Sequence, residues 1–545
     1  QDEHFYQRRR IRRGSHTMTA AHAAALYDAA AARATLRFLV SVAAQQTGHV
    51  LVGGKSVGRG YLYNLDDGAQ PACVTDVEKL RAALAKLMEG DHAIDASDMR
   101  HTDACAVFEA QKMHLSLSLL RSRVTGTVPV HTTFDGKTKF VRLALCGQAL
   151  LPSTSSLKQA PPHISLLDGA LLVSYGAACA EPAEPAAKRA REAAQPAGVL
   201  SKSLLGASRG LSAWGSSLGV SSVGALNGLK ASAASRELHD FILHAEFRQE
   251  GLLADLAAQI ARRCDEGGAR RVGVVCIAGP TSSGKTTFAT KLTMYLRNLG
   301  LTGVALTVDH YYLPLDRQPK YQPRKQRSDV DYDAIESMDA QLVNQHINAL
   351  LDGQQVLTPV YNMKTGYRDG DGTPLKLPAP VAKSLLVIEG IHALNPDFLK
   401  SVPRERIFKV YISPLSALQL DEANALKTTD NRLLRRMCRD YNFRGHSASR
   451  TLSMWANVRN GEGKWIFPFQ DDVDFVVNSA HEYEMAILKP LVEPLLMGVP
   501  PSDPQYEKAR SLLSLLALFN PASTAKVPTT SLLREFIGDG AFDCH

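Results

Sequence analysis

One glycine-rich stretch constrains the fold of this chain more than any other feature. It has the spacing Gly-x4-Gly-Lys-[Ser/Thr], follows an apolar run at residues 272–277 and precedes a helical pattern through Phe288, Leu292 and Leu296. Glycines let the backbone curl around an anion, and the N–H groups at the start of the following helix attract negative charge. The stretch therefore predicts a phosphate-binding loop between a strand and a helix. Its residues are Gly279, Pro280, Thr281, Ser282, Ser283, Gly284, Lys285, Thr286 and Thr287.

Further apolar, β-branched runs lie at 304–308, 385–388, 407–412 and 473–477. Runs of this kind, separated by helical patterns, are typical of a buried parallel sheet. Residues 236–545 are therefore predicted to form an α/β domain of the P-loop NTPase class, in which helices flank a parallel sheet. A helix at 237–263 is expected to begin this domain, and a helical extension to end it.

The preceding part of the chain has a different composition. Residues 26–176 read as ordinary globular sequence, with helix-like stretches at 77–88 and 103–120 and a strand-like stretch at 128–134, so they predict a separate α+β domain. Residues 177–235 are rich in Ala, Pro, Ser and Gly, which indicates a flexible linker. Residues 1–25 are expected to form a disordered basic N-terminus.

Overall composition excludes several classes of protein. A formal charge of +8 over 545 residues is a mild bias toward anionic partners and argues against nucleic acid as the main one. The eight cysteines show no zinc spacing, which favours a reducing compartment, so a cytoplasmic location is expected. No apolar run is long enough to predict a membrane span. The sequence leaves open a homo-oligomer and a targeting role for the N-terminal arginines or for residues 188–191.

Four side chains are candidates for the chemistry. Lys285 should reach the β- and γ-phosphates of ATP, and Thr286 should bind Mg²⁺. Glu389 ends the run at 385–388 and is the expected second metal ligand. Asp309 follows the run at 304–308, and ligand sites of α/β sheets lie at the carboxyl ends of strands. A carboxylate there can accept the proton of an attacking hydroxyl group.

The segment from 431 to 444 is dense in arginine. Two interpretations stay open, a clamp for phosphate groups and a solvated helix face on which Asp430 and Asp440 balance the charge. The arginines are Arg432, Arg435, Arg436, Arg439 and Arg444.

Four short motifs occur in an order that resembles the uridine kinase and uridine-cytidine kinase family, within the phosphoribulokinase/uridine kinase group. The resemblance covers about 273–490. The motifs are Asp309-His310-Tyr311-Tyr312, Val330-Asp331-Tyr332-Asp333, Tyr361-Asn362-Met363 and Ile388-Glu389-Gly390.

This resemblance implies roles for individual residues. Asp309 would be the catalytic base, Asp331 and Arg436 would hold ribose hydroxyls, and Arg439 and Arg444 would be lid residues facing the triphosphate. Tyr312 and Tyr361 would line the nucleobase pocket, and His446 would take a further substrate-binding position. The base-contacting positions depart from the family pattern at Val330, Gly366 and His446, which argues against the family's uridine-reading contacts.

The first domain resembles the second additional domain of threonyl-tRNA synthetase, as fused to a kinase in certain bacterial uridine kinase-like proteins. The stretches that carry this likeness are 58–63, 150–155 and, near the end of the chain, 531–538. The helix expected at 36–46 lacks the synthetase's His-x3-His pair, so hydrolytic editing is not expected and a packing or interaction module is favoured.

The predicted function is ATP-dependent phosphoryl transfer to the 5′-hydroxyl of a nucleoside, with ATP and Mg²⁺ as cofactors. One alternative is a kinase of another small hydroxylated metabolite. Another is a non-catalytic ATP-binding regulator whose first domain binds RNA or protein. The presence of both Asp309 and Glu389 favours chemistry, because a sensor has no need of a carboxylate on the acceptor side.

Overall fold

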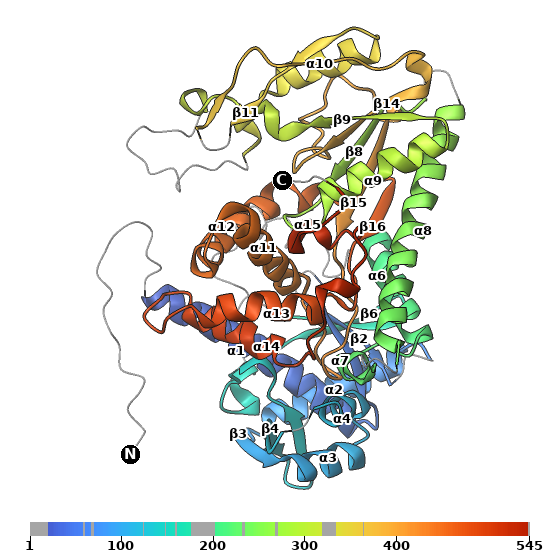
Figure 1. The fold of residues 1–545 in the computed structure, drawn as a ribbon. Coiled ribbons are helices and arrows are strands. Elements are labelled where there is room, and N and C mark those ends of the chain that lie inside the picture. Colours follow the sequence, from blue (N-terminus) through green and yellow to red (C-terminus); the bar gives the residue numbers. More distant parts are fainter. Residues whose placement is uncertain are drawn as a thin grey trace. The chain divides into compact units, whose positions relative to one another are not determined.

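The computed structural model describes residues 20–57, 60–66, 70–123, 125–147, 149–158, 161–175, 202–230, 235–266, 271–318, 334–362 and 365–542. These residues form two compact units (Figure 1). The first consists of the described residues within Gln1–Val199 together with Leu420–Ala425, and the second of the described residues within Leu200–Gln419 and Leu426–His545.

The second unit is built on a five-stranded parallel sheet with the order β16-β15-β8-β14-β9. Each predicted apolar run is one of these strands. The sheet confirms the predicted α/β fold with helices flanking parallel strands. The strands are β8 (Val274–Ala278), β9 (Thr302–Thr307), β14 (Ser384–Glu389), β15 (Ile407–Ser413) and β16 (Phe475–Asn478).

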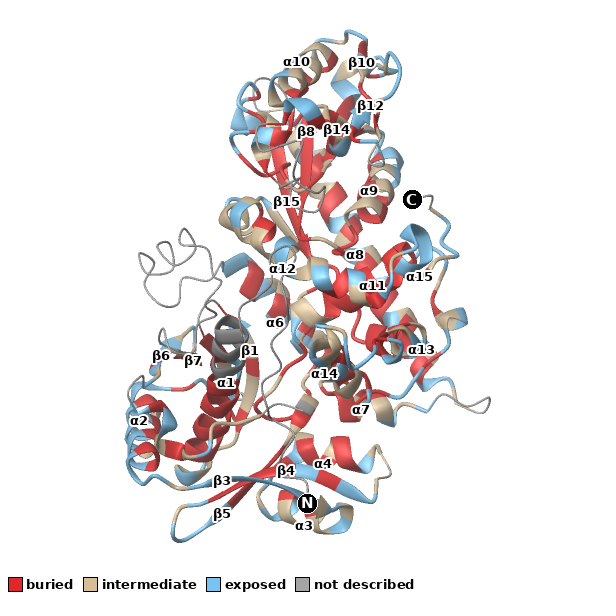
Figure 2. Cartoon of the chain, turned by 90° about the vertical axis from the view of Figure 1, so that its left-hand side faces the viewer, coloured by how far each residue is buried: buried red, intermediate tan, exposed pale blue. Residues whose placement is uncertain are grey.

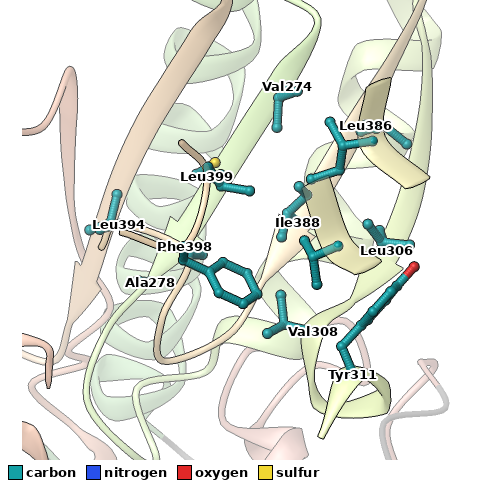
Figure 3. Packing of buried hydrophobic residues seen from close by; sticks show 14 of the residues in the cluster. Val274, Ala278, Leu306, Val308, Tyr311, Leu386, Ile388, Leu394, Phe398 and Leu399 are labelled. Carbon is teal, nitrogen blue, oxygen red and sulfur yellow. The ribbon is translucent and has the colours of Figure 1, made fainter. Parts of the chain in front are cut away.

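The central strands of the sheet are buried (Figure 2). Their side chains alternate between two faces, each with its own apolar cluster. On one face, Val274 and Ile388 pack with Phe398 and with α10 (Ala340–Leu351) (Figure 3). On the other face, Ile277 belongs to a cluster with residues of α8 (Glu237–Asp265) and α9 (Lys285–Asn298). Because both faces are covered, the edge at the carboxyl ends of the strands is the part of the sheet left for a ligand.

Further elements complete the second unit. Two short antiparallel pairs, β10 with β13 and β11 with β12, lie between α10 and β14 in the chain. The strands are β10 (Val356–Thr358), β11 (Tyr361–Asn362), β12 (Tyr367–Arg368) and β13 (Thr373–Leu375). The remaining helices are α6 (Lys202–Ser217), α7 (Val223–Gly228), α11 (Thr428–Arg444), α12 (Ala448–Trp465), α13 (Glu484–Met497), α14 (Tyr506–Leu516) and α15 (Arg534–Ile537).

Helices α6 and α7 differ from the flexible linker predicted at 177–235. Leu204, Leu205 and Leu211 are buried along α6, so a few leucines are enough to anchor a helix within sequence rich in Ser, Ala and Gly. Residues 176–201 and 231–234 of the predicted linker lie outside the described residues. Most of the predicted N-terminal segment at 1–25 also lies outside them, and α1 begins at Ala20.

The first unit has the α+β character that the sequence predicted. It contains a four-stranded antiparallel sheet of order β1-β2-β7-β6 and a three-stranded antiparallel sheet of order β3-β4-β5. Its strands are β1 (Leu51–Val57), β2 (Gly60–Leu65), β3 (Ile94–Arg100), β4 (Thr127–Phe134), β5 (Lys139–Leu143), β6 (His163–Leu167) and β7 (Ala170–Ser174). Its helices are α1 (Ala20–Gln46), α2 (Val74–Glu89), α3 (His101–Ala110) and α4 (His114–Arg121).

Two details of the first unit depart from simple sequence patterns. The helix predicted at 103–120 is divided into α3 and α4, with Lys112 between them at a φ of 55°. The hexapeptide Leu420–Ala425 belongs to this unit, and its Glu422 carboxylate accepts hydrogen bonds from the N–H groups of Leu115 (2.7 Å) and Ser116 (3.1 Å) at the start of α4. A carboxylate is favourable there because helix N-termini carry partial positive charge.

Among the described residues, none of the helices combines the length and the apolar character that crossing a membrane requires.

Candidate functional site

The predicted phosphate-binding loop joins β8 to α9, so the strand and the helix that the motif requires are both present. Gly279 has no room for a side chain, since a Cβ atom there would lie 2.0 Å from the carbonyl oxygen of Ile412 on the neighbouring strand. Gly284 has a φ of 88°, a left-handed conformation that favours glycine. Both glycines of the motif are therefore required by the backbone geometry.

The Lys285 side chain folds over the loop that precedes it. Its Nζ atom donates to the carbonyl oxygens of Gly279 (3.1 Å) and Pro280 (3.2 Å). Burial lowers the pKa of Lys285, while the negative charges of Glu389, Glu535 and Asp309 act to raise it. The ammonium group thus lies among carboxylates that come from three different parts of the second unit.

Thr286 and Glu389 are brought together by strand pairing. Glu389 is opposite Ile277 in the parallel register of β14 with β8, and Thr286 is the second residue of α9. The Thr286 Oγ1 atom donates to Glu389 Oε1 at 3.4 Å. Burial and the nearby Asp309 raise the pKa of Glu389 to about 7, although Lys285 opposes the shift. A hydroxyl and a carboxylate oxygen side by side fit Mg²⁺, which takes a few protein oxygens and completes its shell with phosphate and water.

Asp309 lies where the sequence predicted, directly after β9 in the single turn Val308–Tyr311. Its side chain keeps access to solvent. Desolvation by the surrounding protein raises its pKa, and the positive charges of Lys285, His310 and Arg444 act to lower it. Asp309 therefore shares one electrostatic environment with the loop lysine and with the end of α11.

The first arginines of α11 hold the backbone of the phosphate loop. Arg432 Nε donates to the Thr281 carbonyl at 2.9 Å, and Arg436 Nη1 donates to Thr281 Oγ1 at 3.1 Å. Arg435 is fully buried and also reaches the loop, through the Ser282 carbonyl at 3.5 Å. These burials exclude the solvated-face interpretation for the three arginines.

Four basic side chains from α11 and the residues just after it lie around one buried carboxylate, that of Asp440. Arg436 Nε lies 3.1 Å from it, Arg439 Nη2 3.0 Å, Arg444 Nη1 3.3 Å and His446 Nδ1 3.8 Å. Burial alone would raise the pKa of Asp440, but the arginines outweigh it and the pKa is lowered. Burial and the neighbouring Arg439 lower the pKa of Arg444 to about 10. We name these five residues the Asp440 cluster.

Two carboxylates that contact the loop are not predicted by the sequence patterns. Glu462 on α12 accepts from the Thr281 N–H group at 3.0 Å and pairs with Arg432 and Arg459. Glu535 on α15 accepts from both the N–H group and the hydroxyl of Thr287. Glu535 lies in the stretch 531–538, for which the sequence gives only a resemblance to uridine kinase-like fusion proteins. No local sequence pattern marks Glu462.

The expected acceptor side is described in part. The rings of Tyr312 and Tyr361 lie 5.3 Å apart and are tilted by 43°, so the structure brings these two predicted residues together. Both rings are buried within the core on one face of the sheet. Asp331, the predicted ribose ligand, and Val330 beside it lie outside the described residues.

Comparison with known proteins identifies the segment that carries this geometry. Residues 274–486 match the model of the Phosphoribulokinase / Uridine kinase family. Uridine kinase from Halobacterium salinarum is 28% identical over 202 residues, which is 37% of this chain and 77% of that kinase. Uridine kinase from Staphylococcus aureus strain JH9 is 25% identical over 215 residues, 39% of this chain and 91% of that kinase.

A putative fructose transport system kinase from Silicibacter is among the similar solved structures, with 17% identity and a TM-score of 0.30, covering 41% of this chain and 98% of that one. The sequence matches support a kinase-family domain. They cover less than half of the chain, and the resemblance of residues 26–176 to a synthetase domain stays a prediction.

Proposed function

We propose that this protein transfers the γ-phosphoryl group of ATP to a hydroxyl group of a small acceptor, and that the 5′-hydroxyl of a nucleoside is the first candidate. One observation carries the proposal. The Thr286–Glu389 pair, Lys285 and Asp309 come from a phosphate loop and two strand ends of one sheet, and their charges act on one another. These residues lie within the segment 274–486 that matches the kinase family, which supports the same reaction class.

Each residue has a task in such a transfer. Lys285 would exchange its bonds to the loop carbonyls for bonds to phosphate oxygens, and Thr286 and Glu389 would hold Mg²⁺, which supplies neutralising charge when bound. Asp309 would accept the proton of the attacking hydroxyl, and its raised pKa makes it a better base than an ordinary aspartate. Arg439 and Arg444 would face the phosphates.

We propose a bridging position for Arg436. The residue was expected to hold ribose hydroxyls, and its guanidinium group bonds the Thr281 hydroxyl of the phosphate loop. A side chain placed there can contact the transferred group and the acceptor at once. The acceptor-binding roles of Tyr312, Tyr361, Asp331 and His446 belong to the same proposal.

The test is a panel of nucleosides and other phosphorylatable metabolites, incubated with ATP and Mg²⁺ and analysed by product mass. Asp309→Asn should lower turnover at least about a hundredfold, since general-base catalysis contributes on that scale. The affinity for ATP should stay within about twofold of that of the unchanged protein. Asp316→Asn, at an exposed position a few residues away, is the matched control and should retain activity. ATP consumption that no acceptor stimulates would favour the non-catalytic regulator, and unchanged turnover of Asp309→Asn would refute the base.

A further inference from the structure

The stretch 531–538 is not used by the proposed transfer, yet it touches the phosphate loop. It lies beyond residues 274–486, the segment that matches the kinase family. Its helix α15 carries Glu535, whose Oε2 atom accepts from Thr287 N at 3.2 Å and from Thr287 Oγ1 at 2.9 Å. A residue from outside the kinase-matching segment is therefore bonded to the helix that begins at Lys285.

The position of this bond decides its effect. Thr287 is the third residue of α9, and the N–H groups in the first turn of a helix have no partner within the helix. These are the groups that bind phosphate at a helix N-terminus. In this protein, one of them is already bonded to a carboxylate.

The carboxylate is held firmly in place. Glu535 is 8% exposed, and the preceding Arg534 donates to the carbonyl oxygens of Thr524 (3.0 Å), Val527 (2.6 Å) and Gly538 (3.2 Å). On the other side of Glu535, the Phe536 ring lies 5.2 Å from the guanidinium carbon of Arg435. With these contacts, Glu535 is part of the packed fold and not a loose side chain.

The charge of Glu535 also acts on the rest of the site. Its charge opposes the lowering of the Lys285 pKa by burial and adds to the raising of the Glu389 pKa, so its field acts on the residues proposed to contact phosphate and Mg²⁺. A fixed negative charge beside a triphosphate opposes its binding. If Glu535 only filled space, a neutral side chain of the same size would leave the nucleotide affinity unchanged.

We propose that Glu535 sets the nucleotide affinity of the phosphate loop. It lowers this affinity because its negative charge occupies the helix N-terminus at which a phosphate group would bind. This inference rests on the proposed binding of ATP. It assigns α15 to the nucleotide site as an element that lowers the affinity for phosphate. Nucleotide would therefore dissociate more readily than from the same loop without Glu535.

The experiment compares the full chain with its Glu535→Gln variant by calorimetric titration with ATP and with AMP. Glu535→Gln keeps an oxygen that can accept from Thr287 and removes the charge, so ATP should bind on the order of tenfold more tightly. The gain should be smaller for AMP, which carries less charge. Asp539→Asn removes a charge from an exposed position nearby in the chain and should bind ATP as the unchanged protein does.

The outcomes separate the two proposals. If the unchanged protein binds ATP and Glu535→Gln binds it equally or more weakly, Glu535 is a structural brace and this inference is overturned. If neither binds ATP, the proposed function fails and this inference fails with it. Circular dichroism verifies that the variant is folded, and Glu535→Ala, which also removes the charge, provides a second reading if the glutamine variant is not.

Discussion

Replacing Glu462 with alanine should be among the most damaging single changes in the second unit. Its carboxylate accepts from the Thr281 N–H group at 3.0 Å and from Arg459 at 2.8 Å, and it pairs with Arg432, which is 1% exposed. Without Glu462, Arg432 would keep its 2.9 Å bond to the Thr281 carbonyl and its place 5.4 Å from the centre of the Trp455 ring. Its positive charge would have lost its principal counterion.

The expected cost follows from that geometry. Removing one partner of a buried ion pair costs about 3–5 kcal/mol, because the other charge stays buried and unpaired. The ring of Trp455 offsets a small part of this cost, since a cation over an aromatic ring contributes about 0.5–2 kcal/mol. A loss of about 3 kcal/mol in the free energy of unfolding is therefore the expected result for Glu462→Ala.

Urea denaturation followed by circular dichroism measures this loss directly. Glu405→Ala, at an exposed position, is the control and should change the free energy of unfolding by less than about 0.5 kcal/mol. Glu462→Gln retains an acceptor for the Thr281 N–H group and should lie between the two. A loss below about 1 kcal/mol for Glu462→Ala would show that Arg432 does not depend on this carboxylate, and the reasoning would be wrong.

Three further predictions concern the site and its surroundings. Gly279→Ala places a Cβ atom 2.0 Å from the Ile412 carbonyl, so the loop must shift and ATP affinity should fall at least about tenfold in a fluorescent-nucleotide titration; unchanged affinity would contradict the tight fit. Asp440→Asn removes the carboxylate shared by three arginines, and kcat/KM for ATP should fall at least about tenfold in steady-state assays, whereas wild-type kinetics would show that the arginines need no such anchor. Burial lowers the pKa of His481 to about 3, so below pH 6.5 the unfolded chain binds a proton that the folded chain does not, and stability should fall by about 1.4 kcal/mol between pH 7.5 and 5.5. In His481→Gln, denaturation at the two pH values should show a correspondingly smaller change, and an equal change would refute the assignment.

The elements of the second unit could be predicted because their signals are local. Each strand of the parallel sheet is an uninterrupted apolar run, and the phosphate loop has a fixed spacing that only a strand, a tight turn and a helix satisfy. Asp309 and Glu389 follow from the same signals, because each ends a strand. Helix α6 was missed because its buried leucines are few and its other residues are typical of linkers.

The contacts that organise the site could not be predicted in the same way. Glu462 meets Thr281 across 181 residues of sequence, and Glu535 meets Thr287 across 248. Neither carboxylate stands in a pattern that differs from an ordinary polar helix position. The arginine-dense segment was recognised, but only the structure shows that Arg432 and Arg435 bond the loop backbone while Arg439 and Arg444 share Asp440.

The assignment of Leu420–Ala425 to the first unit has a practical consequence for dissecting the protein. The polypeptide leaves the second unit after Gln419 and re-enters it at Leu426, immediately before α11. A cut at residue 199 therefore does not separate two independent pieces. The C-terminal fragment would keep a hexapeptide that is buried in the full chain, and its Glu422 would lose the N–H groups of Leu115 and Ser116. Removing the hexapeptide as well would shorten the connection that leads into the arginine helix, so activity lost on truncation would not by itself assign a function to the first unit.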